Sequence, residues 1–303
     1  MALQNWARCF SGVLCSPVFS PQFLEQGFGL LEVGGVKALG EPAIDRRQQL
    51  IGCGALALAL WLLGYPDQAR QRSREAISLA RELAHPYSLS YALHWAATVQ
   101  QFRREPHTAL ELTETVLALA HEQGFALFVA LGTILQGWAL SAQSQGLEGM
   151  TQIRAGIAAW RAAGSRAWQP YFLGLLAEAY GDGGHPEEGL QALAEALASI
   201  DSSGERLYAA ELYRLKGELL LQQLAAHQEE AEACFRQALD IARRQQAKSL
   251  ELRAAMSLAR LWQRQGKRAA AYELLAPIYG WFTEGFDTAD LQETKALLDE
   301  LAP

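Results

Sequence analysis

The chain has 303 residues, of which 50% are hydrophobic and 19% are charged, and its formal net charge at pH 7 is −7. This composition is that of a globular chain rather than a disordered one, and the lack of a basic excess argues against a nucleic-acid partner. The most apolar stretch, residues 50–65, contains glycines and Trp61 and is shorter than the roughly 18–20 residues of a membrane span, so we expect no membrane partner.

Residues 1–48 differ from everything that follows, because glycine and proline recur throughout the segment. Their close spacing leaves no room for a long helix, and the first apolar stretch is too short and interrupted to favour a secretory signal. We therefore expect an irregular N-terminal segment, with a non-native or rearranged start as one interpretation of it. The folded region is expected to cover residues 49–303.

Residues 171–200 contain one helix, a tight turn and a second helix. Apolar residues recur at helical spacing on both sides of the glycine-rich turn at residues 181–186. Pro186 suits the first turn of the second helix, and Glu187 and Glu188 complement the positive end of its dipole. The stretch therefore predicts a helical hairpin.

The same hairpin recurs when the sequence is shifted by 40 residues, so that Gly184 corresponds to Ser144, Arg104 and Gly64, and in the forward direction to Leu224. Small residues hold fixed places in both helices, as close packing of two helices requires. The places are Ala57, Ala97, Gly137, Ala177, Gly217 and Ala259 in the first helices, and Ala69, Ala109, Gly149, Gly189, Ala231 and Ala271 in the second. The pattern predicts six hairpins followed by a polar capping helix at residues 287–301.

Each unit resembles the tetratricopeptide repeat, in which a small residue is followed three positions later by an aromatic residue or leucine and four positions after that by a glycine. Ala177, Tyr180 and Gly184 show this pattern clearly. From about residue 55 onward the chain also resembles the C-terminal helical-repeat region of large bacterial signalling ATPases, many of which carry an adenylate/guanylate cyclase domain. The stretches that carry this likeness are 61–69, 101–106, 132–139, 210–222 and 274–292. The resemblance implies an all-α, right-handed superhelical solenoid that acts in signal transduction. If the start of the chain is rearranged, the chain is a fragment of a larger signalling protein.

Catalytic motifs are absent from the sequence, which has neither a GxxxxGK[ST] phosphate loop nor a GxSxG nucleophile elbow. The four cysteines form no CxxC spacing and the six histidines are scattered, which argues against a zinc site and a disulfide framework. Reduced thiols favour a cytoplasmic location. We expect no enzymatic activity, no metal and no cofactor, because the ATPase and cyclase domains of the resembling proteins lie elsewhere.

In tetratricopeptide arrays, the first helices line the concave face with their second, fifth and ninth residues. Carried over to this chain, these places give the candidate binding residues Tyr91, His94, Trp138, Tyr171, Glu178, Glu211, Arg214, Glu218, Arg253 and Arg260. A protein or peptide partner with an apolar half and a charged half would be complementary to them. The alternative is that the aromatic side chains pack between neighbouring first helices and that the charged ones pair on a solvated face.

Two functions therefore stay open. The first is a non-enzymatic protein-interaction scaffold, whose partner lies along the concave face and which in the resembling ATPases senses an input or restrains the ATPase core. The second is a small-ligand-sensing repeat domain that controls an ATPase or a transcription regulator, as in the related repeat domain of the bacterial maltose-regulon activator. An open, continuous groove would favour the first function, and a closed apolar pocket with a few polar groups would favour the second.

Overall fold

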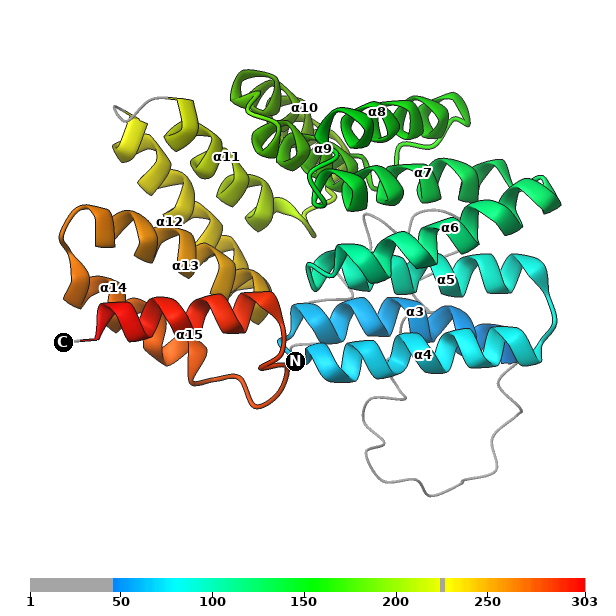
Figure 1. The fold of residues 1–303 in the computed structure, drawn as a ribbon, viewed down its shortest axis with the longest axis horizontal. Helices are drawn as coiled ribbons and strands as arrows, with labels where there is room; N and C mark the ends of the chain where they lie inside the picture. Colours follow the sequence, from blue (N-terminus) through cyan, green and yellow to red (C-terminus); the bar gives the residue numbers. More distant parts are fainter. Residues whose placement is uncertain (1–45, 224–226, 303) are drawn as a thin grey trace.

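The computed structural model describes residues 46–223 and 227–302, and the regular structure in these residues is helical (Figure 1). The predicted all-α class is confirmed. No helix among these residues combines the length and the apolar character needed to cross a membrane. In chain order the helices are α3 (Arg46–Leu62), α4 (Pro66–Glu82), α5 (Pro86–Phe102), α6 (Pro106–Gln123), α7 (Ala126–Ser141), α8 (Gly146–Ala162), α9 (Gln169–Asp182), α10 (Pro186–Ser203), α11 (Ala209–Gln223), α12 (Gln228–Gln245), α13 (Lys248–Arg264), α14 (Arg268–Tyr279) and α15 (Ala289–Leu301).

Consecutive helices pair into hairpins, which we number from hairpin one (α3 and α4) to hairpin six (α13 and α14), with α15 after the last. Nearly all of the predicted irregular segment, residues 1–48, lies outside the described residues. The helix α3 begins at Arg46, slightly before the expected start of the folded region at residue 49. The division of the chain at that residue therefore stays a prediction.

The turns inside the hairpins share one backbone conformation. Gly64 and Gly184 have φ values of 92° and 77°, and Arg104 and Ser144 adopt the same left-handed region at 59° and 66°. The left-handed region is unfavourable for a residue with a Cβ atom, so Arg104 and Ser144 adopt it because the tight turn requires this conformation. The structure thus shows the predicted spacing of 40 residues between turns, and the fifth turn residue, Leu224, lies outside the described part of the chain.

Small residues lie where the two helices of a hairpin meet. A Cβ atom added to Gly137 of α7 would stand 2.6 Å from the carbonyl oxygen of Gly149 in α8. A Cβ atom on Gly217 of α11 would collide with the ring of Phe235 in α12, and Ala177 of α9 is fully buried. Close approach of helix backbones therefore explains the series of small residues in the sequence.

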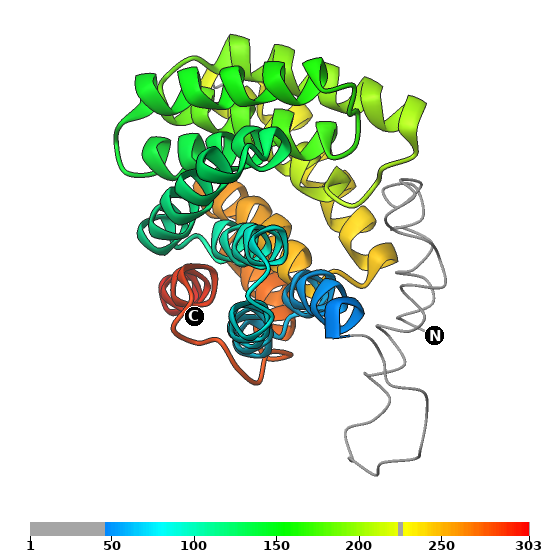
Figure 2. The same cartoon turned by 90° about the vertical axis from the view of Figure 1, so that its right-hand side faces the viewer.

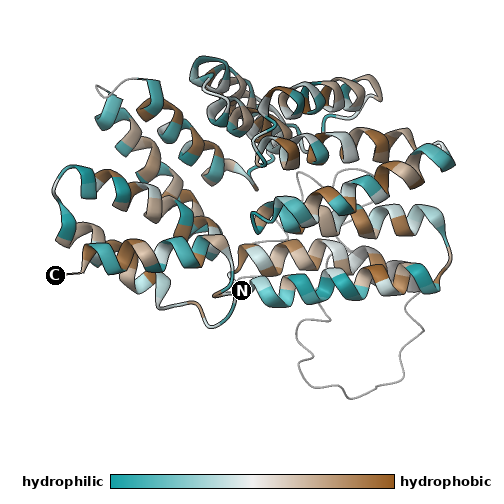
Figure 3. Ribbon diagram, viewed as in Figure 1, coloured by the Kyte–Doolittle hydropathy of each residue, from teal (hydrophilic) through white to brown (hydrophobic). Residues whose placement is uncertain are grey.

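An aromatic column connects the first helices of different hairpins. The ring centroids of Trp61 and Phe102 are 4.9 Å apart, Phe102 stacks on Tyr171 at 5.6 Å, and Tyr171 meets Tyr208 edge-on at 5.1 Å. Apolar residues recur along α3, α5 and α7, whereas α4 carries more polar surface (Figure 3). The core therefore lies along the first helices, and the second helices cover it from outside.

The solenoid closes on itself, because its last helices lie against its first two hairpins (Figure 2). The carboxylate of Glu284 accepts hydrogen bonds from the backbone N–H groups of Asp67 and Gln68, at 2.9 and 3.0 Å, and so caps the start of α4. The N–H of Gly285 donates in return to Oδ2 of Asp67 at 2.9 Å. We call this interface the seam, and it joins residues 248–253 and 281–293 with residues 61–70 and 102–104.

Two buried arginines hold the seam together. Arg253 of α13 donates from Nε to Oδ2 of Asp290 at 2.8 Å and from Nη2 to the carbonyl oxygen of Phe102 at 2.5 Å. Arg103, whose side chain is fully buried, donates from Nη1 to the carbonyl oxygen of Pro66 at 2.7 Å within the first two hairpins, and its Nη2 lies 3.9 Å from Oδ1 of Asp287 across the seam. A buried guanidinium is costly unless its N–H groups find acceptors, so these side chains fix the relative positions of the two ends.

Candidate binding pocket on the concave face

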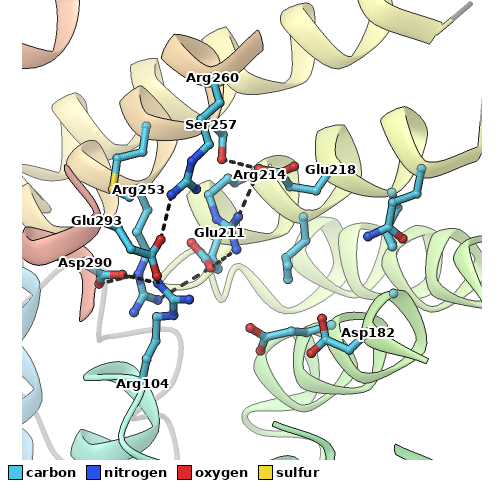
Figure 4. Close-up of a pocket in the computed structure, with 16 residues that line it drawn as sticks. Arg104, Asp182, Glu211, Arg214, Glu218, Arg253, Ser257, Arg260, Asp290 and Glu293 are labelled. Carbon is cyan, nitrogen blue, oxygen red and sulfur yellow. Dashed lines mark hydrogen bonds and ion pairs between the residues drawn. The ribbon is translucent and has the colours of Figure 1, made fainter. Parts of the chain in front are cut away.

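A cavity of about 280 Å³ opens on the concave side, between α9, α11, α13 and α15. The first helices α9, α11 and α13, the capping helix α15 and the turn after α5 contribute charged side chains to it, as Figure 4 shows. The charged lining comprises four arginines and six carboxylates: Arg104, Arg214, Arg253, Arg260, Glu178, Asp182, Glu211, Glu218, Asp290 and Glu293.

Six of the ten predicted binding residues line this pocket, namely Glu178, Glu211, Arg214, Glu218, Arg253 and Arg260. Four further residues that the repeat register does not predict line it as well, namely Arg104, Asp182, Asp290 and Glu293. Asp182 lies one helical turn after Glu178, so its spacing could have revealed it. The other three reach the pocket only because the seam brings α15 and the turn after α5 to the concave side.

The four remaining candidates lie outside the pocket, in or near the aromatic core. Tyr171 is buried, its hydroxyl is 3.0 Å from Oε1 of Gln101, and burial raises its pKa well above the usual value. Burial also lowers the pKa of His94, to about 4, so its ring is neutral at pH 7. The ring of Tyr91 packs 6.1 Å from that of Trp95, and burial likewise raises the pKa of its hydroxyl.

Trp138, the fourth of these candidates, joins the core to the pocket. Its ring is buried, and its indole Nε1–H donates a hydrogen bond of 3.0 Å to Oε2 of Glu178. For this aromatic residue and the other three, the structure favours packing between first helices over direct contact with a partner. The physical reason is that successive first helices contact one another closely enough to enclose large side chains.

On the α11 and α13 side of the pocket, arginines neutralise the carboxylates. Glu211 accepts a hydrogen bond of 2.7 Å from Arg214, and Nη1 of Arg253 lies 3.6 Å from it. Burial alone would raise the pKa of Glu211, but these two guanidinium groups hold it below its usual value. Glu218 accepts a hydrogen bond of 2.6 Å from the hydroxyl of Ser257 and lies 3.6 Å from Arg214.

The α15 side is neutralised in the same way. Asp290 is bound by Arg253 and lies 3.2 Å from Nη1 of Arg104. Glu293 accepts from Arg104 and from Arg260, both at 2.8 Å. Although burial opposes ionisation, these two arginines keep the pKa of Glu293 below its usual value.

The α9 side differs, because its two carboxylates have no cationic partner within 4.0 Å among the described residues. Burial raises the pKa of Glu178, and the neighbouring negative charges of Glu211 and Asp182 raise it further. Burial likewise raises the pKa of Asp182. Arg214 opposes both shifts, with Arg253 acting on the pKa of Glu178 and Arg104 on that of Asp182. The wall therefore presents negative charge that is offset only from a distance and not by a direct ion pair.

The described residues contain no group of three or more histidine, cysteine, aspartate or glutamate side chains placed to hold a metal ion. Cys53 and Cys234 are free thiols, and Cys9 and Cys15 lie outside the described residues.

Comparison with known proteins gives partial matches. A family model described as anaphase-promoting complex subunit 5 matches residues 52–103 and 203–266. The uncharacterized protein R02095 of Rhizobium meliloti (strain 1021) is 25% identical over 214 residues, which make up 70% of this chain and 21% of that protein. The chain therefore spans about a fifth of the length of this relative.

Two solved structures match almost the whole chain. A Rap protein complexed with competence and sporulation factor has a TM-score of 0.63 at 16% identity, covering 99% of this chain and 79% of the other. The apo form of RapI has a TM-score of 0.57 at 11% identity, covering 98% of this chain and 99% of the other. At these identities the likeness concerns the fold alone. The chain has a tetratricopeptide-like helical-repeat fold.

Proposed function

We propose that the chain is a non-enzymatic protein-interaction module that binds its partner in the charged pocket on the concave face. The observation that carries this proposal is the negative wall of the concave cavity, where the half-buried Glu178 and the exposed Asp182 have no direct ion pair among the described residues. Unpaired charge at a concave site is costly to maintain and is relieved when a complementary partner binds. The structural neighbour solved with competence and sporulation factor is a further support, since it is a similar fold in a complex.

A more specific role, within a larger signalling protein, rests on the resemblance to signalling ATPases. We propose that the chain is the regulatory repeat region of a larger bacterial protein, in which partner binding at the pocket reports to an ATPase or cyclase domain. The relative from Rhizobium meliloti supports this, because the chain corresponds to only 21% of its length. A cytoplasmic location belongs to the same proposal.

The second candidate function, sensing of a small metabolite, fits the pocket less well. Sites for small molecules are typically about 300–1,000 Å³ and mostly apolar, with few polar groups. This cavity, at about 280 Å³, is at the lower end of that range and is lined mainly by charged side chains. A side chain of a protein partner suits these dimensions better than a whole metabolite.

Site-specific photo-crosslinking tests the proposal. Gln222 is exposed and lines the pocket, whereas Arg244 of α12 is equally exposed and does not line it. A benzophenone amino acid placed at Gln222 in the native host should crosslink one defined partner, which mass spectrometry identifies. The same probe at Arg244 should give no adduct with that protein. Adducts formed only from Arg244, or equally from both positions, would contradict binding in the pocket.

A further inference from the structure

The two carboxylates of the α9 wall lie one helical turn apart on the same face. Glu178 and Asp182 are at positions i and i+4, and the charge of Asp182 disfavours ionisation of Glu178. The only hydrogen bond to the Glu178 carboxylate within the described residues comes from the neutral indole of Trp138. Two like charges at this spacing destabilise a helix unless a cation lies between them.

The arginines of the pocket act on these two carboxylates only from beyond ion-pair distance. Each of the four arginines in the lining already contacts carboxylates of α11 or α15, so that six carboxylates face four guanidinium groups. The uncompensated part of this charge lies on the α9 wall, where Figure 4 shows Asp182 facing the groups of α11 across the cavity. The pocket therefore has room and charge for one more cation.

An independent observation points to a ligand with several N–H groups. Glu211 is only 3% exposed and lines the cavity, yet its Oε2 accepts no hydrogen bond from any described residue. A buried carboxylate oxygen without a donor is rare in folded proteins and costs free energy until a donor arrives. Nε of Arg214, in the same lining, has no acceptor among the described residues and so does not supply this hydrogen bond. The donor is therefore missing at Glu211, in the cavity whose α9 wall lacks a direct cation.

We propose that this cavity binds the guanidinium group of an arginine side chain from the protein partner; the inference rests on the proposed function and specifies its chemistry. A guanidinium group is planar and carries five N–H donors, so it can bridge Glu178 and Asp182 while another N–H group approaches Glu211. Leu215 and Leu219 also line the cavity and offer apolar contact to the methylene groups of the arginine stem. An ammonium group has fewer donors and no fork, so arginine is preferred over lysine.

The indole N–H of Trp138 supplies a direct reporter, because it donates to the Glu178 carboxylate. In the ¹⁵N-labelled chain its resonance is assigned by its loss in a Trp138→Phe variant. We expect N-acetyl-L-arginine amide to shift this resonance in a saturable way at millimolar concentrations. The lysine analogue should bind more weakly, and the uncharged, isosteric citrulline analogue should cause no shift.

The double variant Glu178→Gln, Asp182→Asn keeps the shapes of both side chains and an acceptor for Trp138 but removes both charges. It should weaken binding of the arginine analogue by about tenfold or more, because charge-assisted hydrogen bonds become neutral ones. The matched control is Glu187→Gln, Glu188→Gln on the exposed start of α10, which should leave the affinity unchanged. Thermal melts verify that both variants are folded.

The proposal is overturned if the arginine and citrulline analogues shift the indole resonance equally, if the double variant binds as the parent does, or if no saturable shift occurs. An equal response to Mg²⁺ would overturn it too, since the site would then accept any cation. These outcomes are separate from the crosslinking result. If Gln222 crosslinks the partner but the arginine analogue does not bind, only the guanidinium assignment is wrong. If the arginine analogue binds but only Arg244 forms crosslinks, the proposed function is wrong.

Discussion

Arg253, in the sixth hairpin, donates a hydrogen bond of 2.5 Å to the carbonyl oxygen of Phe102, at the end of the first helix of the second hairpin. Its guanidinium group also lies 4.9 Å from the ring centroid of Trp61, in the first hairpin. One side chain thus joins three hairpins across the seam. In an open solenoid each repeat contacts only its neighbours, so this closure makes the two ends depend on each other.

The first prediction follows from this closure. Arg253→Met keeps an apolar stem but removes the donors to Phe102 and Asp290 and leaves the buried Asp290 with less compensation. Breaking a buried ion pair in this way typically costs about 3–5 kcal/mol, so the unfolding midpoint in urea should fall clearly. The control Arg72→Met removes an exposed pair with Glu75 and should cost less than about 1 kcal/mol. Equal midpoints for the two variants would show that the seam does not stabilise the chain.

A second prediction concerns the cap that Glu284 places on α4. Glu284→Ala removes the acceptor for the backbone N–H groups of Asp67 and Gln68. Loss of such a cap typically costs about 0.5–2 kcal/mol. Amide hydrogen exchange at the start of α4 should therefore accelerate, while exchange at the start of α5, which the side chain of His85 caps locally, should not change. Unchanged exchange at Asp67 and Gln68 would mean that the two ends do not stay together in solution.

The third prediction tests the register of the repeats with one substitution at two sites. Ala177 is fully buried against the second helix of its hairpin, whereas Ala194 of α10 is exposed. Ala177→Arg should lower the melting temperature by several degrees or prevent folding, because bulk and charge enter a packed helix contact. Ala194→Arg should change stability by less than about 0.5 kcal/mol. Comparable melting temperatures would place the helix contact elsewhere.

Much of the fold could be predicted because its signals are local. The small residues and the turn at Gly184 repeat at a fixed spacing, and each reflects contacts within one hairpin. The seam could not be predicted in this way, since closure depends on the small rotation that each repeat adds to the superhelix. The sequence accordingly predicts only a capping role for the last helix, whereas in the structure its Asp290 binds Arg253 and Arg104.

The candidate binding residues also differ in whether one helix alone predicts their position or whether packing between helices decides it. Register alone identified Glu211 and Arg214, because the concave positions of a first helix are fixed by its own period. Whether a large side chain such as Tyr171 faces solvent or its neighbours depends instead on how closely successive first helices pack. The burial of Tyr171 in contact with Phe102 and Tyr208 therefore could not be predicted from the sequence and is seen only in the three-dimensional structure.

The fourth prediction concerns pH. Burial raises the pKa of Glu205 to about 7, although the N–H of Trp168 donates to its carboxylate. The folded state therefore binds a proton that the unfolded chain releases near pH 4.5, so this group stabilises the fold fully below pH 4.5 and loses that contribution as pH rises through 7. Glu205→Gln, which cannot ionise, should match the parent near pH 5 and melt at a higher temperature at pH 8. A difference in melting temperature that does not depend on pH would contradict the assignment.

The measurement that tests the central claim most directly is hydrogen exchange of the chain alone and in complex with the partner identified by crosslinking. If the concave pocket of the closed solenoid is the binding site, protection should appear in the stretches of α9, α11 and α13 that line it, at residues 178–182, 211–222 and 253–260. The outer helices α10 and α12 should exchange as in the free chain. Protection confined to α10 and α12, with none at the pocket, would contradict the account.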